Sequence, residues 1–130
     1  MSKRFASIFL SFILFAAPLA AEVRLLMADE AGCVWCAAWD REIGPIYPKS
    51  PEGEAAPLMR IDIAELATTQ IAFDRPVVYT PTFVLVIDGA EVDRLEGYPG
   101  QDFFWVLVSR MLSENDISTE TLPAETEAEG

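Results

Sequence analysis

Two cysteines, Cys33 and Cys36, are the residues of this 130-residue chain whose types and spacing could do chemistry. They are its only cysteines, and the stretch GCVWC leaves two residues, Val34 and Trp35, between them. A pair spaced in this way can staple the chain, contribute to a metal site or act as a reactive dithiol. What the sequence predicts about function depends on which of these applies.

The alternatives to a reactive dithiol are weakly supported. A disulfide across two residues closes too short a loop to gain much stability. Zinc normally takes four ligands, and the chain has no histidine and no further cysteine. Copper delivery would need histidine or methionine close by, and Met27 is the one candidate. The sequence therefore favours a dithiol that needs neither a metal nor an organic cofactor.

A helix predicted at 33–43 gives the pair its chemistry. It opens at the cysteines and is stopped by Gly44-Pro45. The N-terminus of a helix carries unpaired N–H groups and about half a positive charge, which stabilise a thiolate. We therefore expect Cys33, at the exposed tip, to attack a partner disulfide and Cys36, one turn further in, to resolve the mixed disulfide.

Residues 1–21 have the layout of a secretory signal peptide, with Lys3 and Arg4 before an apolar stretch and small residues at its end. Cleavage is expected after Ala21 or Ala20. The apolar stretch is shorter than the roughly 20 residues of a membrane span, which disfavours the alternative of an uncleaved anchor. Residues 22–113 then form one domain, and the acidic residues 114–130 are typical of a disordered tail.

The chain without this leader is strongly acidic. All 21 acidic residues remain, whereas the basic residues fall from 9 to 7, so the net charge is −14. Such a surface argues against binding of nucleic acid and of anionic lipid. The charge favours solubility and a basic partner, and no nucleic acid. No later stretch is long and apolar enough to span a membrane, so no stable membrane insertion is expected after cleavage.

The remaining pattern predicts an α/β domain with the element order β-α-β-α-β-β-α. Strands are expected at 22–27, 58–63, 82–87 and 91–96, the last two joined as a hairpin by Asp88-Gly89. Residues 46–57 are expected to be a loop that can include a helical turn, and a second helix should run from Ala64 until Arg75-Pro76 ends it. The first two crossovers suit parallel strands covered by helices.

A final helix is expected at 101–112. Several side chains are interpreted as structural rather than functional. Trp39 is interpreted as a packing residue. One apolar helix face is formed by Phe104, Leu107, Val108 and Met111. The charges of the hairpin are interpreted as surface carboxylates: Asp88, Glu91, Asp93 and Glu96.

Taken together, these features resemble the thioredoxin superfamily. The C-x-x-C follows a strand and opens a helix, Thr80-Pro81 precedes a later strand, and Gly97 follows the last strand. The resemblance covers about residues 22–113 and implies a thioredoxin-like fold, a central mixed sheet flanked by helices. It implies that Thr80 and a cis Pro81 lie beside the disulfide and that Gly97 borders the same groove. Trp35 and Tyr98 are further candidate substrate-binding residues.

Within the superfamily, four segments are similar to the SoxS-like periplasmic thioredoxins of bacterial sulfur-oxidation clusters: GCVWC, YPKSPEGEAAPL, TPTFVL and RLEGYPGQDFFW. That family implies a periplasmic reductant of a disulfide or blocked thiol on a sulfur-carrier protein. Because the periplasm is kept oxidising, it also implies a membrane thiol–disulfide transporter as electron donor.

Some residues depart from the common thioredoxin pattern. Gly32 stands where thioredoxins have Trp, and Val34-Trp35 replaces their Gly-Pro. Met27 occupies the position of a buried acid that moves protons for the resolving thiol, so proton transfer would use water, Asp29 or Glu30. A histidine between the cysteines would indicate an oxidant, and none is present. An oxidase or isomerase, and a non-catalytic redox-sensing binding module, remain the alternatives to a reductase.

Overall fold

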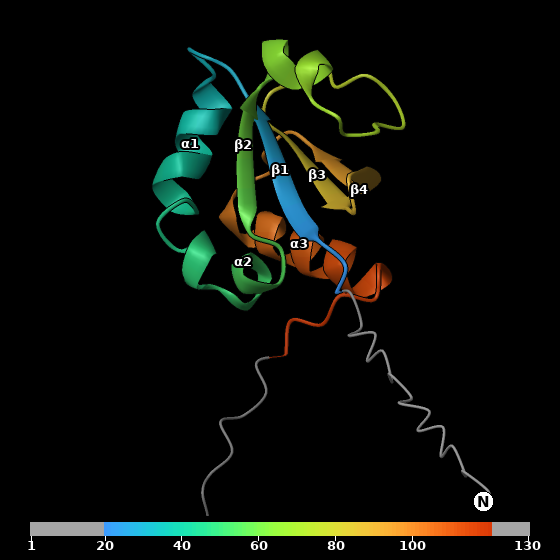
Figure 1. The fold of residues 1–130 in the computed structure, drawn as a ribbon. Helices are drawn as coiled ribbons and strands as arrows, with labels where there is room; N and C mark the ends of the chain where they lie inside the picture. Colours follow the sequence, from blue (N-terminus) through green and yellow to red (C-terminus); the bar gives the residue numbers. More distant parts are fainter. Residues whose placement is uncertain (1–19, 121–130) are drawn as a thin grey trace, which may run out of the picture.

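The structure of the chain is a computed structural model that describes residues 20–120 (Figure 1). Residues 1–19 of the predicted signal peptide and residues 121–130 of the predicted tail lie outside the described residues. None of the helices between residues 20 and 120 has the length and hydropathy that crossing a membrane requires.

Four strands form a mixed sheet in the order β2-β1-β3-β4. The central strand β1 (Val23–Asp29) lies parallel to β2 (Leu58–Asp62) and antiparallel to β3 (Thr82–Ile87). β4 (Ala90–Glu96) pairs antiparallel with β3 at the other edge. Together with the helices α1 (Val34–Glu42) and α3 (Gln101–Glu114), this confirms the predicted mixed sheet flanked by helices.

Alternation along the two central strands divides the core into two clusters. One face of β1 and β3 packs with α1 and α3; its members include Leu25, Met27, Phe83 and Leu85. The opposite face, with Leu26, Ala28, Val84 and Val86, packs against Leu66 of the following 3-10 helix η2 (Ile63–Thr68). The larger cluster also contains Trp39, Phe104, Val108 and Met111, which confirms the packing roles predicted for these side chains. Leu107, the fourth member of the predicted helix face, is half-buried and belongs to neither cluster.

Residues 46–57, predicted as a loop that can include a helical turn, contain two short helices. They are the 3-10 helix η1 (Tyr47–Lys49) and the α-helix α2 (Pro51–Ala55). The buried Tyr47 hydroxyl donates to the Ala56 carbonyl at 2.7 Å. Gly53 packs on the Tyr47 carbonyl, where an added Cβ would come within 1.8 Å. A buried tyrosine and a glycine contact thus fold a proline-rich stretch into regular turns.

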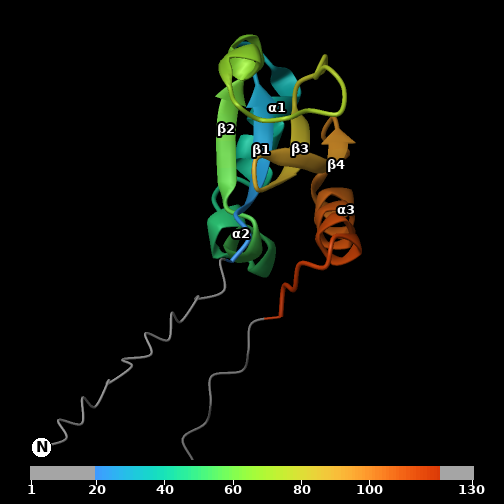
Figure 2. The same ribbon diagram turned by 45° about the vertical axis from the view of Figure 1, so that its right-hand side comes forward.

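The segment between β2 and β3 also differs from the prediction. The helix ends at Thr68, because Thr68 and Thr69 donate their hydroxyls back to the carbonyls of Glu65 and Leu66. Ala72 then forms a bridge with the start of β4, and the chain returns beside that strand (Figure 2). At about 3.3 Å per extended residue, residues 72–80 are long enough to return along the length of β4 to the other end of the sheet. β3 therefore begins at the end of the sheet where β1 ends and runs antiparallel to β1, so the predicted second parallel crossover was wrong.

The interpretation of Glu91 as a surface carboxylate was also wrong. In the ladder, Asp93 faces Leu85 and Glu91 faces Val86, so Val92 is an extra, bulged residue. In a regular strand, residues three apart point to opposite faces, but the bulge brings Glu91 and Arg94 to the same side. Their side chains, 2% and 3% exposed, form a buried ion pair.

This pair predicts a specific loss of stability in acid. Burial alone would raise the pKa of Glu91, but hydrogen bonds from Arg94 and from the Asp74 amide hold this pKa below its ordinary value of 4.5. A carboxyl with a lowered folded-state pKa contributes stability above its unfolded pKa, and this contribution is lost as the pH falls through the folded value. We expect the difference in unfolding free energy between wild type and Glu91→Gln to be full at about pH 7 and smaller at about pH 3. Urea titrations at both pH values measure it, and a difference that is unchanged or larger in acid would contradict this account.

The C-terminus of α3 is an ordered cap at residues for which a tail was predicted. Asp116 has a left-handed φ of 60°, its N–H bonds to the Ser113 carbonyl, and the N–H of Ile117 bonds to the Leu112 carbonyl. This is the Schellman arrangement, in which the residue after the left-handed position often packs on the helix. Ile117 does pack on the larger core cluster. Ordered packing therefore extends to Ile117.

Candidate active site

Three segments far apart in sequence meet at one end of the sheet. The segment 29–36 follows β1, the segment 79–82 precedes β3, and the segment 96–98 follows β4. The strand register aligns them, because Ala28 pairs with Thr82 and Thr82 pairs with Glu96. The predicted site residues Cys33, Cys36, Thr80, Pro81 and Gly97 therefore lie in segments that meet at this end of the sheet.

The cysteine pair forms a disulfide at the start of α1. Cys33 is the N-cap of the helix, and its Sγ accepts a hydrogen bond of 3.1 Å from the N–H of Cys36. Cys33 is half-buried, whereas Cys36 is only 4% exposed and packs in the core. In the reduced state, the same N–H is positioned to stabilise a thiolate on Cys33. Both accessibility and hydrogen bonding therefore favour attack by Cys33.

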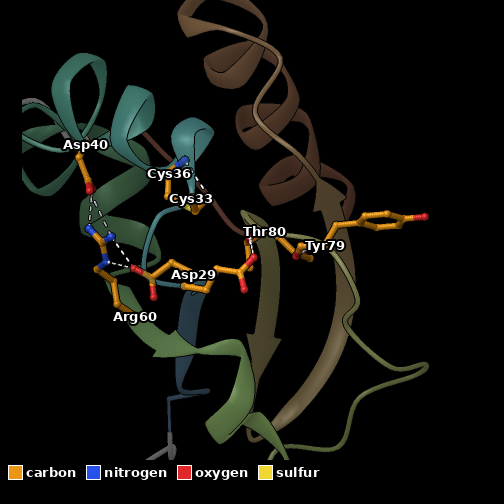
Figure 3. The surroundings of a disulfide bond; sticks show 9 residues. Asp29, Cys33, Cys36, Asp40, Arg60, Tyr79 and Thr80 are labelled. Atoms are coloured by element: carbon orange, nitrogen blue, oxygen red, sulfur yellow. Dashed lines mark hydrogen bonds and ion pairs between the residues drawn. A yellow bond between two sulfur atoms is a disulfide. The ribbon is translucent and has the colours of Figure 1, made fainter.

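Thr80 and Pro81 lie next to the cysteine loop, and the peptide bond between them is cis. The Thr80 hydroxyl donates to Glu30 Oε1 at 2.6 Å, while the Glu30 carbonyl accepts the N–H of Cys33 at 3.3 Å. Figure 3 shows Thr80 on the side of the site that carries Cys33. Glu30 thus joins the loop before β3 to the loop that holds the disulfide.

Gly97 lies beside Pro81. Its N–H donates to the Pro81 carbonyl at 2.8 Å, and its φ of +86° lies in the region that favours glycine. The structure therefore brings Thr80, Pro81 and Gly97 together with the disulfide loop.

Large apolar side chains are exposed in two of these segments. Trp35, between the cysteines, is 62% exposed and follows Val34, which is 74% exposed. In the other segment Val78 and Tyr79 are 64% and 61% exposed, and Figure 3 shows Tyr79 pointing away from the disulfide. Exposed aromatic and aliphatic groups beside a reactive bond are typical of a surface that contacts other proteins.

Tyr98 is placed differently from the prediction. It is only 8% exposed, belongs to the larger core cluster, and donates its hydroxyl to Glu42 at 2.5 Å. Burial, followed by the hydrogen bond to Glu42, raises the pKa of the Tyr98 hydroxyl. Glu42 ends α1, about 13 Å along the helix from Cys33 at 1.5 Å per residue. The hydroxyl therefore fastens the far end of α1, and this position argues against a substrate-binding role.

An open hollow of about 450 Å³ lies beside the disulfide, on the side away from Tyr79. Both cysteines line it together with Asp29, Asp40 and Arg60. Arg60, on β2, donates to Asp29 through Nε at 2.9 Å and to Asp40 through Nη1 at 2.5 Å (Figure 3). The hydrogen bond to Asp40 is the main cause that raises the pKa of Arg60 further above its usual value. Arg60 thus ties the end of β1 to the last turn of α1.

This hollow also shows where proton carriers lie. Met27 is fully buried in the core cluster that includes Cys36, so it offers no acid–base group there. Glu30 lines the hollow with both cysteines, and so does Asp29. The structure thus places both carboxylates at the hollow that the cysteines line, and their part in taking a proton from the Cys36 thiol stays a prediction.

Sequence reasoning missed the contacts of Glu30 with Thr80 and of Arg60 with Asp29 and Asp40. Arg60 had one local signal, a charged residue inside an apolar strand. Its partners lie 20 and 31 residues away, and nothing local specifies them. Among residues 20–120, no group of three or more His, Cys, Asp or Glu side chains is arranged to hold a metal ion.

The site can be compared with known proteins. No protein-family model matches the chain, and no curated protein sequence matches it. Among solved structures, the chain is similar to the reduced form of the periplasmic thioredoxin SoxS from Paracoccus pantotrophus, with 47% identity and a TM-score of 0.70. That match covers 72% of this chain and 99% of the SoxS chain.

Two more distant structures share the fold. The thioredoxin of Fasciola hepatica is 22% identical with a TM-score of 0.52, over 68% of this chain and 80% of its own. The thioredoxin of Malassezia sympodialis is 19% identical with a TM-score of 0.50, over 68% of this chain and 74% of its own. Both similarities support the thioredoxin-like fold.

Proposed function

The chain belongs to the family of the periplasmic thioredoxin SoxS, and from this membership we propose that it is a periplasmic thiol–disulfide oxidoreductase that reduces a partner protein. The observation that carries the proposal is the disulfide at the start of α1, where Cys33 is the more accessible cysteine and receives the N–H of Cys36. The predicted signal peptide supports export to the periplasm, and the SoxS relative is a periplasmic thioredoxin.

The reaction transfers two electrons from the reduced chain to the partner. The Cys33 thiolate attacks one sulfur of the partner disulfide, which forms a mixed disulfide and releases the first partner thiolate. The Cys36 thiolate then attacks Cys33 Sγ, closes the intramolecular disulfide and releases the second partner thiolate. The partner is reduced and the chain is oxidised. An external dithiol, by family resemblance that of a membrane thiol–disulfide transporter, returns two electrons and is itself oxidised.

The surface around the disulfide supports docking of a protein. Trp35 lies between the cysteines, and Val78 and Tyr79 directly precede Thr80 and Pro81; all three expose apolar area. The partner would then be a protein with a disulfide or a blocked thiol, and by family resemblance a carrier protein of sulfur oxidation. No metal or organic cofactor takes part in the proposed reaction.

Turnover with a protein disulfide tests the activity. With an excess of a reducing agent, the chain should catalyse reduction of many equivalents of insulin, which loses its disulfides and precipitates. A non-catalytic binding module would reduce at most one equivalent. A rate no higher than that of the reducing agent alone would therefore refute the oxidoreductase proposal.

The direction of electron flow is tested by the reduction potential of the Cys33–Cys36 pair. We expect a value near that of thioredoxin, about −270 mV, because a reductant must give up its electrons readily. Equilibration in glutathione buffers followed by thiol trapping measures it. A value near about −120 mV, as for a strong periplasmic oxidant, would instead make the chain a disulfide former.

A further inference from the structure

A long segment outside the helices and strands leads into the candidate site. Residues 69–81 connect η2 to β3. The segment ends with the exposed Val78 and Tyr79 and then Thr80 and Pro81. Val78 and Tyr79 carry their side chains outward rather than into the core. On the side of β3 the segment is held by the hydrogen bonds of Thr80 to Glu30 and of the Thr82 hydroxyl to the Tyr79 carbonyl. On the other side it is held by the contacts of the residues before Val78. The contacts of residues 72–76 therefore fix the side of the segment that leads into Val78 and Tyr79.

The buried Glu91–Arg94 pair of β4 supplies these contacts. Arg94 binds Glu91 through two hydrogen bonds, from Nε to Oε1 at 2.6 Å and from Nη2 to Oε2 at 2.7 Å. Such a bidentate arrangement fixes the plane of the guanidinium group. Removing the bulge at Val92 would turn the two side chains to opposite faces, so the pair exists because of this irregularity.

The same pair binds the backbone of the neighbouring segment at three consecutive residues. Glu91 Oε2 accepts the N–H of Asp74 at 2.9 Å. Arg94 donates from Nη2 to the Arg75 carbonyl at 2.8 Å and from Nη1 to the Pro76 carbonyl at 3.2 Å. These backbone groups belong to an irregular segment without a partner strand at those positions, so two side chains take the place of a β ladder.

We propose that Glu91 and Arg94 are positioning residues for partner recognition: by fixing the backbone of residues 74–76, they set the place of Val78 and Tyr79 beside the disulfide, together with the hydrogen bonds that hold Tyr79 and Thr80 from the other side. The inference rests on the proposed function, because it assumes that residues 78–80 contact the partner. A small disulfide needs only access to Cys33. A protein must also meet the surface formed by Val78, Tyr79 and Thr80, so loss of the positioning contacts slows the reaction with proteins selectively.

The substitution Arg94→Lys tests this proposal. It keeps a positive charge opposite Glu91, but a single ammonium group cannot bind the carboxylate and both carbonyls in the geometry of the guanidinium fork. Arg75→Lys is the matched control, because Arg75 lies in the same segment and its exposed guanidinium binds Glu96 instead. Glu91→Gln, which keeps the side-chain volume, is the second variant for the case that Arg94→Lys does not fold.

The measurement is the single-turnover rate of thiol–disulfide exchange, followed by tryptophan fluorescence, with hydroxyethyl disulfide and with oxidised and reduced insulin. We expect Arg94→Lys to slow exchange with insulin about tenfold and to change exchange with hydroxyethyl disulfide less than twofold. Arg75→Lys should leave both rates within about twofold of wild type. Hydrogen exchange of the amides in residues 72–80 should be faster in Arg94→Lys, with the other strands unchanged.

Two results would overturn the proposal, and they are distinguishable. If a folded Arg94→Lys or Glu91→Gln variant exchanges with insulin as fast as wild type, or loses both rates equally, the positioning role is refuted while the proposed function stands. If wild type exchanges with hydroxyethyl disulfide but with neither form of insulin, the oxidoreductase proposal for protein partners is refuted together with the positioning role.

Discussion

Replacing Cys33 with serine is expected to abolish disulfide reduction, with a loss on the order of a thousandfold or more in turnover. Serine differs by one atom, but its hydroxyl stays protonated at neutral pH and cannot form the mixed disulfide. The fold should be retained, because Cys33 is the N-cap of α1 and serine is a favourable N-cap that can accept the N–H of Cys36. Insulin reduction in the presence of an excess of reducing agent measures the loss, and thermal unfolding checks the fold.

The matched variant Cys36→Ser separates the two roles. Cys33 can still attack, but no second thiol resolves the intermediate, so a covalent adduct of one chain and one partner should accumulate. Mass spectrometry after acid quenching detects it. If Cys36→Ser fails to form the adduct and Cys33→Ser forms it instead, the attacking thiol is Cys36, in spite of its 4% exposure. Retention of turnover by Cys33→Ser would refute the dithiol mechanism altogether.

The parts of the fold that could be predicted have local signals. The strand at 82–87 has the predicted bounds, because an unbroken run of β-branched and aromatic residues is followed by a two-residue turn. The helix that opens at the cysteines was predicted because Gly44-Pro45 ends it. Each of these signals lies within the element that it specifies.

The parts that could not be predicted depend on long-range contacts. The burial of Glu91 requires a bulge at Val92, and the ladder register that creates the bulge is a property of two strands. Likewise, Tyr98 was assigned to the groove from its place beside Gly97, but its orientation is set by Phe104 and by Glu42, which lies 56 residues away. The neighbouring residues in the sequence predict the loop to which Tyr98 belongs, but not the direction in which its side chain points.

A second large effect is expected from Phe104→Ala. The Phe104 ring is fully buried, and five aromatic rings surround it with centroids between 5.0 and 6.4 Å, those of Trp39, Tyr47, Phe83, Tyr98 and Trp105. Truncation removes the ring's buried surface and leaves a cavity that large, rigid neighbours fill poorly, so the free energy of unfolding should fall by about 3–5 kcal/mol. Urea titration of the oxidised protein measures the change.

The neighbouring Phe103 provides the matched control, since it is 67% exposed on the same helix. Phe103→Ala should change the free energy of unfolding by no more than about 0.5 kcal/mol, because the exposed Phe103 side chain buries little area in the folded protein. The comparison also bears on the active site, since Phe104 packs on Trp39, one turn after Cys36 on α1. If both variants lost the same stability, the aromatic cluster would not be the support of α1. The position of the disulfide would then have to depend on the contacts of Arg60 and Glu30.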